Sequence, residues 1–311
     1  MSVIVLATPT PRSVQDPAGV WVFDWVVPAV GGLIMLASVL DCVRRRQLSW
    51  GFLFLSNSML VYWMETVGDW AQHLVYSPAF RAHHLLDWLP LKTSTDPLFM
   101  PFAYAIYWTV HAVAVLWLGQ LLVRKYGWSL LTAIAVISLP VNYLWDIAVE
   151  SAAVSVGWWT YDPGFGPVIE FANGGRQPLM WPVLLMTFWP NLIAYWAGKP
   201  PVRTLNHIER LFRLDRLTRP AAPAPEPAAA VLGQSDRASG PAEETRRSAR
   251  ARYDGLLDYQ VIGSRWRFEL ARFGAWFVVF QASFFVMLII PLVTLRIATG
   301  HDSDYLPPNT R

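Results

Sequence analysis

Six long apolar stretches alternate with polar segments along this chain. A helix needs roughly 20 mostly apolar residues to cross about 30 Å of hydrocarbon. The stretches run approximately over Trp21–Cys42, Trp50–Asp69, Phe99–Val123, Trp128–Val154, Leu179–Ala197 and Leu270–Ala298. Three of the six begin with Trp, as membrane spans often do at the interface with water. The pattern predicts an all-α, polytopic transmembrane helical bundle with about six spans.

Prolines and polar segments refine this picture. Pro28, Pro140, Pro190 and Pro291 lie inside apolar runs, where neighbouring helices satisfy the freed carbonyls, so we expect kinks and not breaks. The predicted organisation is a five-span core with outer-side loops over 1–200, a basic amphipathic segment over 201–219, a disordered Ala/Pro-rich linker over 220–250, and a final span with its tail over 251–311.

The distribution of Lys and Arg predicts the orientation of the spans. The segments after spans one, three and five hold nineteen of the twenty-five basic residues, among them Arg44, Arg45, Arg46, Arg124 and Lys125. Short loops rich in Lys and Arg stay cytoplasmic. We therefore expect a multi-pass protein of the plasma membrane with both termini outside, and we expect the linker and the basic segment to be cytoplasmic.

Composition and charge exclude several classes of protein. Only 15% of the residues are charged, against about 25% in soluble domains, so no large soluble domain remains. The single cysteine, Cys42, excludes an internal disulfide framework and a cysteine-based zinc site. Val202–Leu217 carries Leu and Phe at helical spacing with Arg between them. This segment predicts a helix on membrane lipids and not a nucleic-acid partner.

Two acidic stripes carry the candidate chemistry. Glu65, Asp69 and His73 are four residues apart at the end of the second span, and Asp146 and Glu150 have the same spacing at the end of the fourth. Residues four apart lie on one face if the helix continues, and both stripes fall on the outer side. Intramembrane acids are costly and indicate function, although Asp69 and Glu150 would cost little in the headgroup region. Acids that share a cavity suit acid–base catalysis.

Other polar and aromatic residues are candidates for substrate binding. They are Trp70, His73, His111, Tyr143, Trp145, Tyr161 and Arg176. His111 either faces the same cavity or bonds to a backbone carbonyl, and Arg176 is either a counter-ion for the carboxylates or an exposed loop charge. No nucleotide-binding, hydrolase or metalloprotease motif occurs, and the Glu-x-x-His pairs of di-iron bundles are missing. We expect neither a metal nor a cofactor.

Three groups of motifs resemble the AveC-like spirocyclase family, which is named for a membrane protein of avermectin biosynthesis. The first comprises Asp69-Trp70, Val75-Tyr76-Ser77-Pro78, Trp88-Leu89-Pro90 and Asp96-Pro97-Leu98-Phe99. The second is Trp145-Asp146 to Glu150, followed by Gly157-Trp158-Trp159-Thr160-Tyr161, and the third is Gln177-Pro178-Leu179-Met180-Trp181. The motifs cover about residues 50–200 in family order. Pro182 stands where the family pattern has an acid, and the Ala/Pro linker has no counterpart in that pattern.

The resemblance implies a cofactor-independent cyclisation in which a dihydroxy-ketone becomes a spiroketal through an oxocarbenium ion. In this chain, Asp146 or Glu65 would protonate the departing hydroxyl, and Glu150 or Asp69 would accept the proton of the attacking hydroxyl. The partner would be an apolar or lipid-like polyhydroxylated molecule. The alternative is a non-enzymatic lipid-binding or transport protein whose carboxylates bind a cation or carry protons. No feature of the sequence indicates an oligomeric state.

Overall fold

The computed structural model describes residues 10–93, 95–164, 166–180, 183–198, 205–220, 259–303 and 305. Over these residues the chain is mostly helical. Four continuous helical segments are long and apolar enough to cross a membrane: Val22–Arg45, Met100–Tyr126, Leu130–Ser155 and Arg265–Thr299. They comprise η2 (Val22–Val26) with α1 (Val27–Arg45), α4 (Met100–Tyr126), α5 (Leu130–Ile137) with η3 (Ser138–Asn142) and α6 (Tyr143–Ser155), and α10 (Arg265–Phe284) with η5 (Phe285–Ile289) and α11 (Ile290–Thr299).

Prolines inside the apolar runs do not end the helices, as the sequence predicts. Pro28, Pro140, Pro190 and Pro291 all lie within helical backbone. Wide π-helical turns accompany three of them: η2 ends just before Pro28, η3 contains Pro140, and η5 ends just before Pro291. Proline has no N–H and its ring clashes with the carbonyl four residues earlier. A local π turn accommodates that clash without breaking the helix.

Two of the six expected spans do not form single long helices. Trp50–Asp69 becomes α2 (Trp50–Leu60) and α3 (Tyr62–Ala71), which meet at Val61. Met64 N donates to Val61 O at 3.0 Å, a tighter turn than the α-helical one. The stretch expected over Leu179–Ala197 is helical from Val183, as the fifteen-residue α7 (Val183–Ala197). Length and composition alone therefore identify four spanning helices among the described residues and not six.

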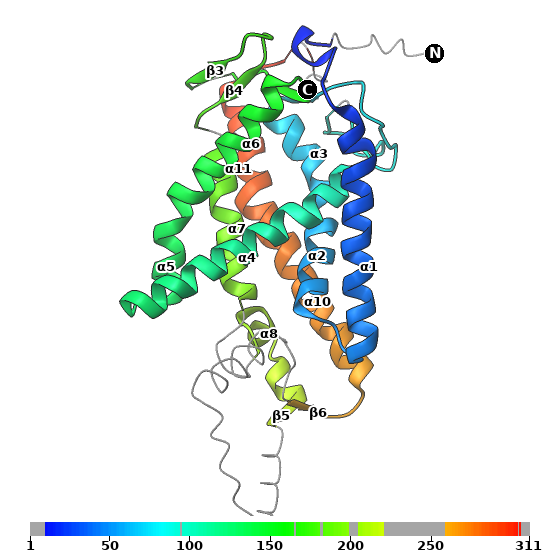
Figure 1. Ribbon diagram of the computed structural model, residues 1–311, viewed down its shortest axis with the longest axis vertical. Helices are drawn as coiled ribbons and strands as arrows, with labels where there is room; N and C mark the ends of the chain where they lie inside the picture. The colour runs from blue at the N-terminus through cyan, green and yellow to red at the C-terminus, as the bar shows by residue number, and fades with distance from the viewer. Residues whose placement is uncertain are drawn as a thin grey trace, which may run out of the picture.

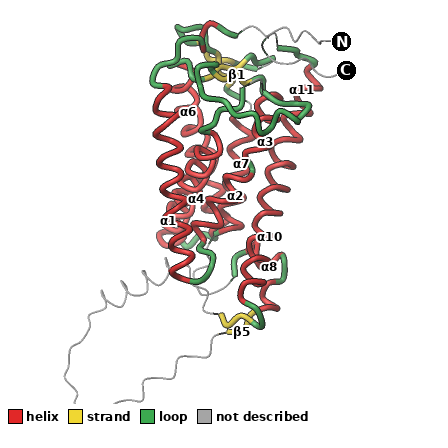
Figure 2. Tube along the Cα trace, turned by 90° about the vertical axis from the view of Figure 1, so that its right-hand side faces the viewer, coloured by secondary structure: helices red, strands yellow, loops and turns green. Residues whose placement is uncertain are grey.

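Hydrogen bonds show which helix ends lie together. Near the start of the first helix, Ala18 N donates to Val156 O just past α6. At the opposite end, Trp50 Nε1 donates to Ala197 O at 2.7 Å, which joins the start of α2 to the end of α7. Figures 1 and 2 show the same arrangement: α6, α11 and β1 lie toward one end, and α8 and β5 toward the other. Consecutive legs of the chain therefore run in opposite directions through the bundle.

Three short antiparallel strand pairs correct the all-α prediction. β1 (Leu74–Tyr76) pairs with β2 (Trp159–Tyr161), and β3 (Val168–Glu170) pairs with β4 (Arg176–Pro178). β5 (Thr218–Pro220) and β6 (Tyr259–Val261) form the third pair. In the first pair Val75 lies opposite Thr160, so this pair joins the segment after α3 to the segment after α6. The aromatic and β-branched residues of these loops favour such pairing.

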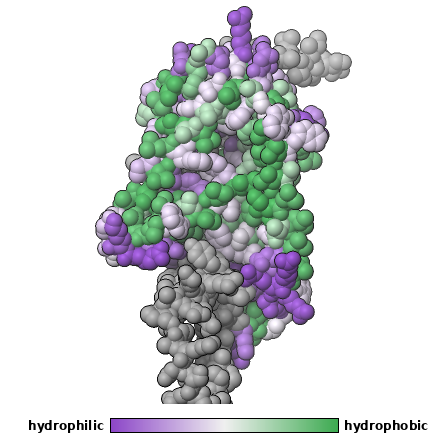
Figure 3. Space-filling view, in the orientation of Figure 1, coloured by the Kyte–Doolittle hydropathy of each residue, from purple (hydrophilic) through white to green (hydrophobic). Residues whose placement is uncertain are grey.

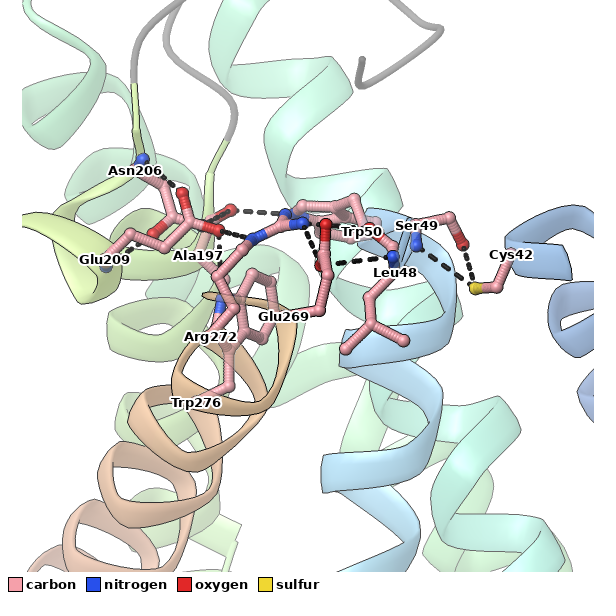
Figure 4. A network of polar contacts seen from close by, with 10 residues as sticks. All are labelled: Cys42, Leu48, Ser49, Trp50, Ala197, Asn206, Glu209, Glu269, Arg272 and Trp276. Carbon is pink, nitrogen blue, oxygen red and sulfur yellow. Dashed lines mark hydrogen bonds and ion pairs between the residues drawn. The ribbon is translucent and has the colours of Figure 1, made fainter. Parts of the chain in front are cut away.

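A buried polar network holds the α8 end of the bundle (Figure 4). Arg272 of α10 is 4% exposed and donates from Nε to Glu209 Oε1 at 2.7 Å, and from Nη1 to Leu48 O and Glu269 Oε2, both at 3.0 Å. Glu209 belongs to α8 (His207–Leu211), where it forms a capping box with Asn206. One guanidinium thereby joins α8 and α10 to the start of α2.

The basic segment is less helical than its sequence predicts. Of the helix expected over Val202–Leu217, residues 205–217 are described, and they form α8 and the short η4 (Leu214–Leu217). Arg213 between them adopts a φ of 56°, a left-handed conformation that ends a helix. Ile208 and Leu214 are buried in the core cluster, whereas Leu211 and Phe212 remain exposed. Apart from Pro220, the expected linker over 220–250 lies outside the described residues.

Aromatic rings fill the centre of the bundle. Trp189 of α7 is fully buried and makes edge-on contacts with Trp108 of α4 and with Phe280 and Phe284 along α10. Its Nε1 donates to Ser283 Oγ at 3.0 Å, so the buried indole nitrogen is satisfied. Figure 3 shows mainly hydrophobic surface along the middle of one face, with hydrophilic residues gathered toward both ends.

Candidate active site

The two acids of the first stripe, Glu65 and Asp69, lie one turn apart on α3. Glu65 and Asp69 are both buried, at 5% and 2% exposure. Asp69 Oδ1 accepts a hydrogen bond from Gln72 Nε2 at 2.8 Å. Gly68 lies on the neighbouring helical face, packed against Ile289 and Leu292, and a Cβ at this position would lie 3.3 Å from Ile289. The close packing of α3 against η5 and α11 therefore fixes the direction of the acidic face.

The helix does not continue to His73, so the predicted three-residue stripe is wrong at its last member. α3 ends at Ala71, and His73 adopts a φ of 58°. This conformation reverses the chain into β1, and the His73 carbonyl accepts from Asp162 N at 2.9 Å. Its ring contacts the His301 ring, with centroids 4.8 Å apart. Burial, together with Arg296 and His301, lowers the pKa of His73 to about 3, so this imidazole is neutral.

The second acidic stripe forms as its spacing predicts. Asp146 and Glu150 are one turn apart on α6 and are 6% and 9% exposed. The two acids belong to the side of α6 that faces the protein, whereas Leu144 and Trp145 are exposed on the other side. An amphipathic pattern of this kind orients a helix with its polar face inward when its surroundings are apolar.

A cavity of about 170 Å³ joins the two stripes. Glu65, Asp146 and Glu150 line it together, and nine of its other lining residues are aromatic. The described residues that line it are Phe23, Glu65, Gln72, Leu74, Tyr76, Phe99, Met100, Ala103, Tyr104, Tyr107, Trp108, Asp146, Val149, Glu150, Trp158, Trp159 and Tyr161. Asp69 does not line the cavity but contacts it through Gln72. A concave, mostly apolar cavity with a few polar groups is the usual form of a small-molecule site.

The β1–β2 pair positions two donors on Glu150. Trp159 Nε1 and Tyr161 OH, from alternate positions of β2, both donate to Glu150 Oε2 at 2.7 Å. Burial and the charge of Glu150 raise the pKa of the Tyr161 hydroxyl, which therefore remains a donor. Two donors on one carboxylate oxygen favour the ionised form of that carboxyl group.

Asp146 has a different environment. Tyr107 OH of α4 donates to Asp146 Oδ1 at 3.2 Å. The second oxygen, Oδ2, is buried and has no hydrogen-bond partner among the described residues. A buried carboxyl oxygen without a donor is costly when it is charged, and it is the oxygen that would carry a proton. Asp146 and Glu150 thus differ in hydrogen bonding in the way that an acid and a base would.

No Lys, Arg or His is among the described residues that line this cavity. Arg296 of α11 is fully buried, but its guanidinium lies over the Trp70 ring, 3.8 Å from the centroid, and donates to the Trp70 carbonyl. Lys92 pairs with Asp87 and Asp96 in the loop before α4. The three carboxyl groups therefore have no basic side chain beside them in the cavity wall.

No family model, curated protein or solved structure matches this chain.

Several of the predicted substrate-binding residues lie away from the cavity. Trp70 stacks with Arg296, and His73 contacts His301, as described above. His111 is buried on α4 beside Tyr107 and Trp108 but does not line the cavity.

Three more of the predicted substrate-binding residues, Tyr143, Trp145 and Arg176, also do not line the cavity. Tyr143 OH donates to the Leu179 carbonyl, and Trp145 is 51% exposed. Arg176 pairs with Glu170 at 3.1 Å on an exposed β-pair, so the exposed-charge alternative holds and the counter-ion role does not. Among the predicted substrate-binding residues, only Tyr161 lines the cavity.

Helix α4 contributes cavity-lining residues that were not among the candidates predicted from sequence. Met100, Ala103, Tyr104, Tyr107 and Trp108 line one wall of the cavity. They recur at spacings of three and four residues, which is the signature of one helical face. A stripe of Tyr and Trp in the first turns of an apolar helix was the signal available to find them. Among the described residues, no three His, Cys, Asp or Glu side chains form a group that would hold a metal ion.

Proposed function

We propose that this protein is a multi-pass membrane enzyme that cyclises an apolar, hydroxylated substrate by acid–base catalysis. The observation that carries the proposal is the shared cavity, where Glu65 and Asp146 come from different legs of the chain and face the same aromatic walls. The proposed class is a spirocyclase or dehydratase of the AveC-like type. Two of the resembling segments, Trp145–Glu150 and Gly157–Tyr161, supply six of the lining residues.

Six membrane crossings form part of this proposal. Besides the four long helices, the α2–α3 pair and α7 would each complete a crossing, and the alternating direction of the legs supports this. Arg44, Arg45, Arg46, Arg124 and Lys125 lie at the ends of α1 and α4 that are opposite to the cavity end. By the distribution of basic residues, that end would be cytoplasmic, and the cavity and both termini would be on the outer side of a plasma membrane.

The proposed reaction converts a dihydroxy-ketone into a spiroketal and water. After the first hydroxyl closes on the ketone, Asp146 Oδ2 donates its proton to the hemiketal hydroxyl. The C–O bond then breaks, water departs, and an oxocarbenium ion remains. The second hydroxyl attacks this carbon and its proton passes to Glu150. Asp146 loses one proton and Glu150 gains one, so a single proton transfer between them restores the starting state.

The aromatic walls have two roles in this proposal. The faces of Tyr107, Trp108 and Trp159 would stabilise the cationic intermediate by cation–π attraction, worth about 2 kcal/mol in a desolvated site. They would also exclude water that competes with the second hydroxyl. Glu65 completes the acidic wall opposite α6, and Asp69 acts through Gln72 as a positioning residue.

A turnover assay separates the enzyme from a carrier. The purified protein in detergent would be incubated with a lipophilic dihydroxy-ketone, and loss of one water would be followed by mass spectrometry. We expect spiroketal formation above the uncatalysed rate without any ion gradient. Proton flux in liposomes that depends on the ketone, with no turnover in detergent, would contradict the enzyme and favour a transport protein.

A further inference from the structure

The wall of the cavity has the chemistry of a receptor for a positive charge. This inference deepens the proposed function because it concerns the same site, and it names a ligand class that the cavity would hold. Three carboxyl groups and nine aromatic side chains surround a space of about 170 Å³, and no basic side chain is among the lining residues that the structure describes.

The described cavity wall does not supply enough hydrogen-bond donors or positive charge for its carboxyl groups. Glu150 receives two donors, but Asp146 Oδ2 receives none among the described residues although Asp146 is 6% exposed. A buried carboxylate without a partner is costly in a medium of low dielectric constant. Arg296 and Lys92 contact Trp70 and Asp96, which are not among the described residues that line the cavity. In the proposed reaction Asp146 is protonated in the resting site, and a cationic ligand would supply the positive charge that lets Asp146 ionise.

The aromatic rings select among cations. Tyr107 and Trp108 of α4 contact each other edge to face, with centroids 4.8 Å apart, and Tyr76 and Trp159 do the same at 5.9 Å. Ring faces attract organic ammonium groups, and enclosing sets of rings bind quaternary ammonium. A hydrated metal ion would instead need more oxygen ligands, and the described acids are not grouped to provide them.

The size and the opening of the cavity limit the ligand further. The volume is below the roughly 300–1,000 Å³ of sites that bury a drug-sized molecule. Phe23, Ala103, Tyr107 and Val149 line the cavity and remain partly exposed, so it opens between α1, α4 and α6. On the face shown in Figure 3, paler surface interrupts the hydrophobic surface above α4. The cavity thus admits a small head group while the rest of a molecule stays outside.

We propose that this cavity binds a small organic ammonium group, as a quaternary ammonium or a protonated amine, between the carboxylates of α3 and α6 and the aromatic rings of α4 and β2. Such a cation mimics the charge of the proposed oxocarbenium ion, so it would also compete with the substrate.

Choline and its neutral isostere 3,3-dimethylbutan-1-ol test the proposal without any mutation. Both would be titrated at constant ionic strength into the full-length protein in uncharged detergent. Binding would be followed by calorimetry and by the fluorescence of Trp108, Trp158 and Trp159, which line the cavity. We expect choline to bind about tenfold or more tightly than the alcohol. Equal affinities, or no saturable choline binding, would overturn the proposal.

A pair of variants places the binding in the cavity. Asp146→Asn keeps the shape of the side chain and should weaken choline binding about tenfold or more. Glu170→Gln, on the exposed β3–β4 pair, should bind choline as the wild type does. Unchanged binding in Asp146→Asn, or equal loss in both variants, would overturn the assignment to this cavity. Turnover of the ketone without choline binding would support the proposed enzyme and contradict only the ammonium site. Choline binding without turnover would support the ammonium site and contradict the proposed enzyme.

Discussion

The hydroxyl of Tyr161 donates to Glu150 Oε2 at 2.7 Å, and this bond connects the β2 strand to α6. Trp159, two residues earlier on the same strand, donates to the same oxygen. Because β2 pairs with β1, and β1 directly follows α3, the strand pair aligns the two acidic helices. The loop segments thereby position the carboxyl group that we propose as the base.

Removal of the Tyr161 hydroxyl should lower turnover and leave the fold intact. Tyr161→Phe removes one of two donors from Glu150, and a hydrogen bond to a charged group is worth about 1.5–3 kcal/mol. We expect the turnover rate to fall about tenfold or more and the thermal midpoint to decrease by only a few degrees, so that the variant stays folded in the assay. Tyr143→Phe is the matched control, since Tyr143 donates to the Leu179 carbonyl away from the cavity. Equal activity in the two variants would contradict the role of Tyr161.

Loss of the buried ion pair at the α8 end should destabilise the protein. Glu209→Gln removes the charge that Arg272 faces at 2.7 Å, and both side chains are less than 5% exposed. Breaking a buried pair on one side costs about 3 kcal/mol when the remaining charge has no other partner. Arg272 keeps Glu269 at 3.0 Å, so we expect a cost of about 2 kcal/mol here. Unfolding in detergent by heat or denaturant measures this cost.

The exposed pair between Glu170 and Arg176 provides the comparison for Glu209. Glu170→Gln should change the free energy of unfolding by less than about 1 kcal/mol. If Glu209→Gln were as mild as Glu170→Gln, the network in Figure 4 would not hold α2, α8 and α10 together.

His73 should make the protein less stable in mild acid. Burial lowers its pKa to about 3, whereas a histidine in the unfolded chain has a pKa of about 6.5. Below pH 6.5 the unfolded chain therefore binds a proton that the folded protein does not, and stability falls as the pH decreases. The contribution reaches about 2 kcal/mol near pH 5.

The variant His73→Asn isolates this effect, because Asn tolerates the positive φ at this position. Thermal midpoints at pH 7.5 and pH 5 should differ less in the variant than in the wild type. The same acid-induced decrease in both proteins would show that burial at this position does not keep His73 in its neutral form.

The helical framework and the pairing of acids within α6 follow from sequence spacing alone. Asp146 and Glu150 are four residues apart in an uninterrupted helix, so the rule of one helical face applies to them. The same rule fails at His73 because α3 ends two residues earlier. No Gly, Asn or Pro stands at the turn to announce the end of that helix. Hydrogen bonding between β1 and β2, which join distant parts of the chain, determines where the chain turns.

The aromatic wall was harder to predict. α4 is apolar on nearly every side, so hydropathy does not indicate which face of α4 turns toward the acids. Tyr104 and Trp108 face inward because α4 packs against α2 and α7. Their spacing marks one helical face, but only this tertiary packing determines that the face turns toward the acids. Trp70 and Trp145 looked equivalent in sequence, yet one is stacked beneath Arg296 and the other is exposed.

The turnover rate of Asp146→Asn tests the central claim most directly. Asp41→Asn, on the exposed i,i+4 pair with Arg45, controls for the loss of an acid in general. Both variants would be purified in detergent and matched by thermal midpoint before the ketone is added. The account predicts a decrease of about 10²–10⁴-fold for Asp146→Asn and an unchanged rate for Asp41→Asn. A wild-type rate in the well-folded Asp146→Asn protein would contradict the account.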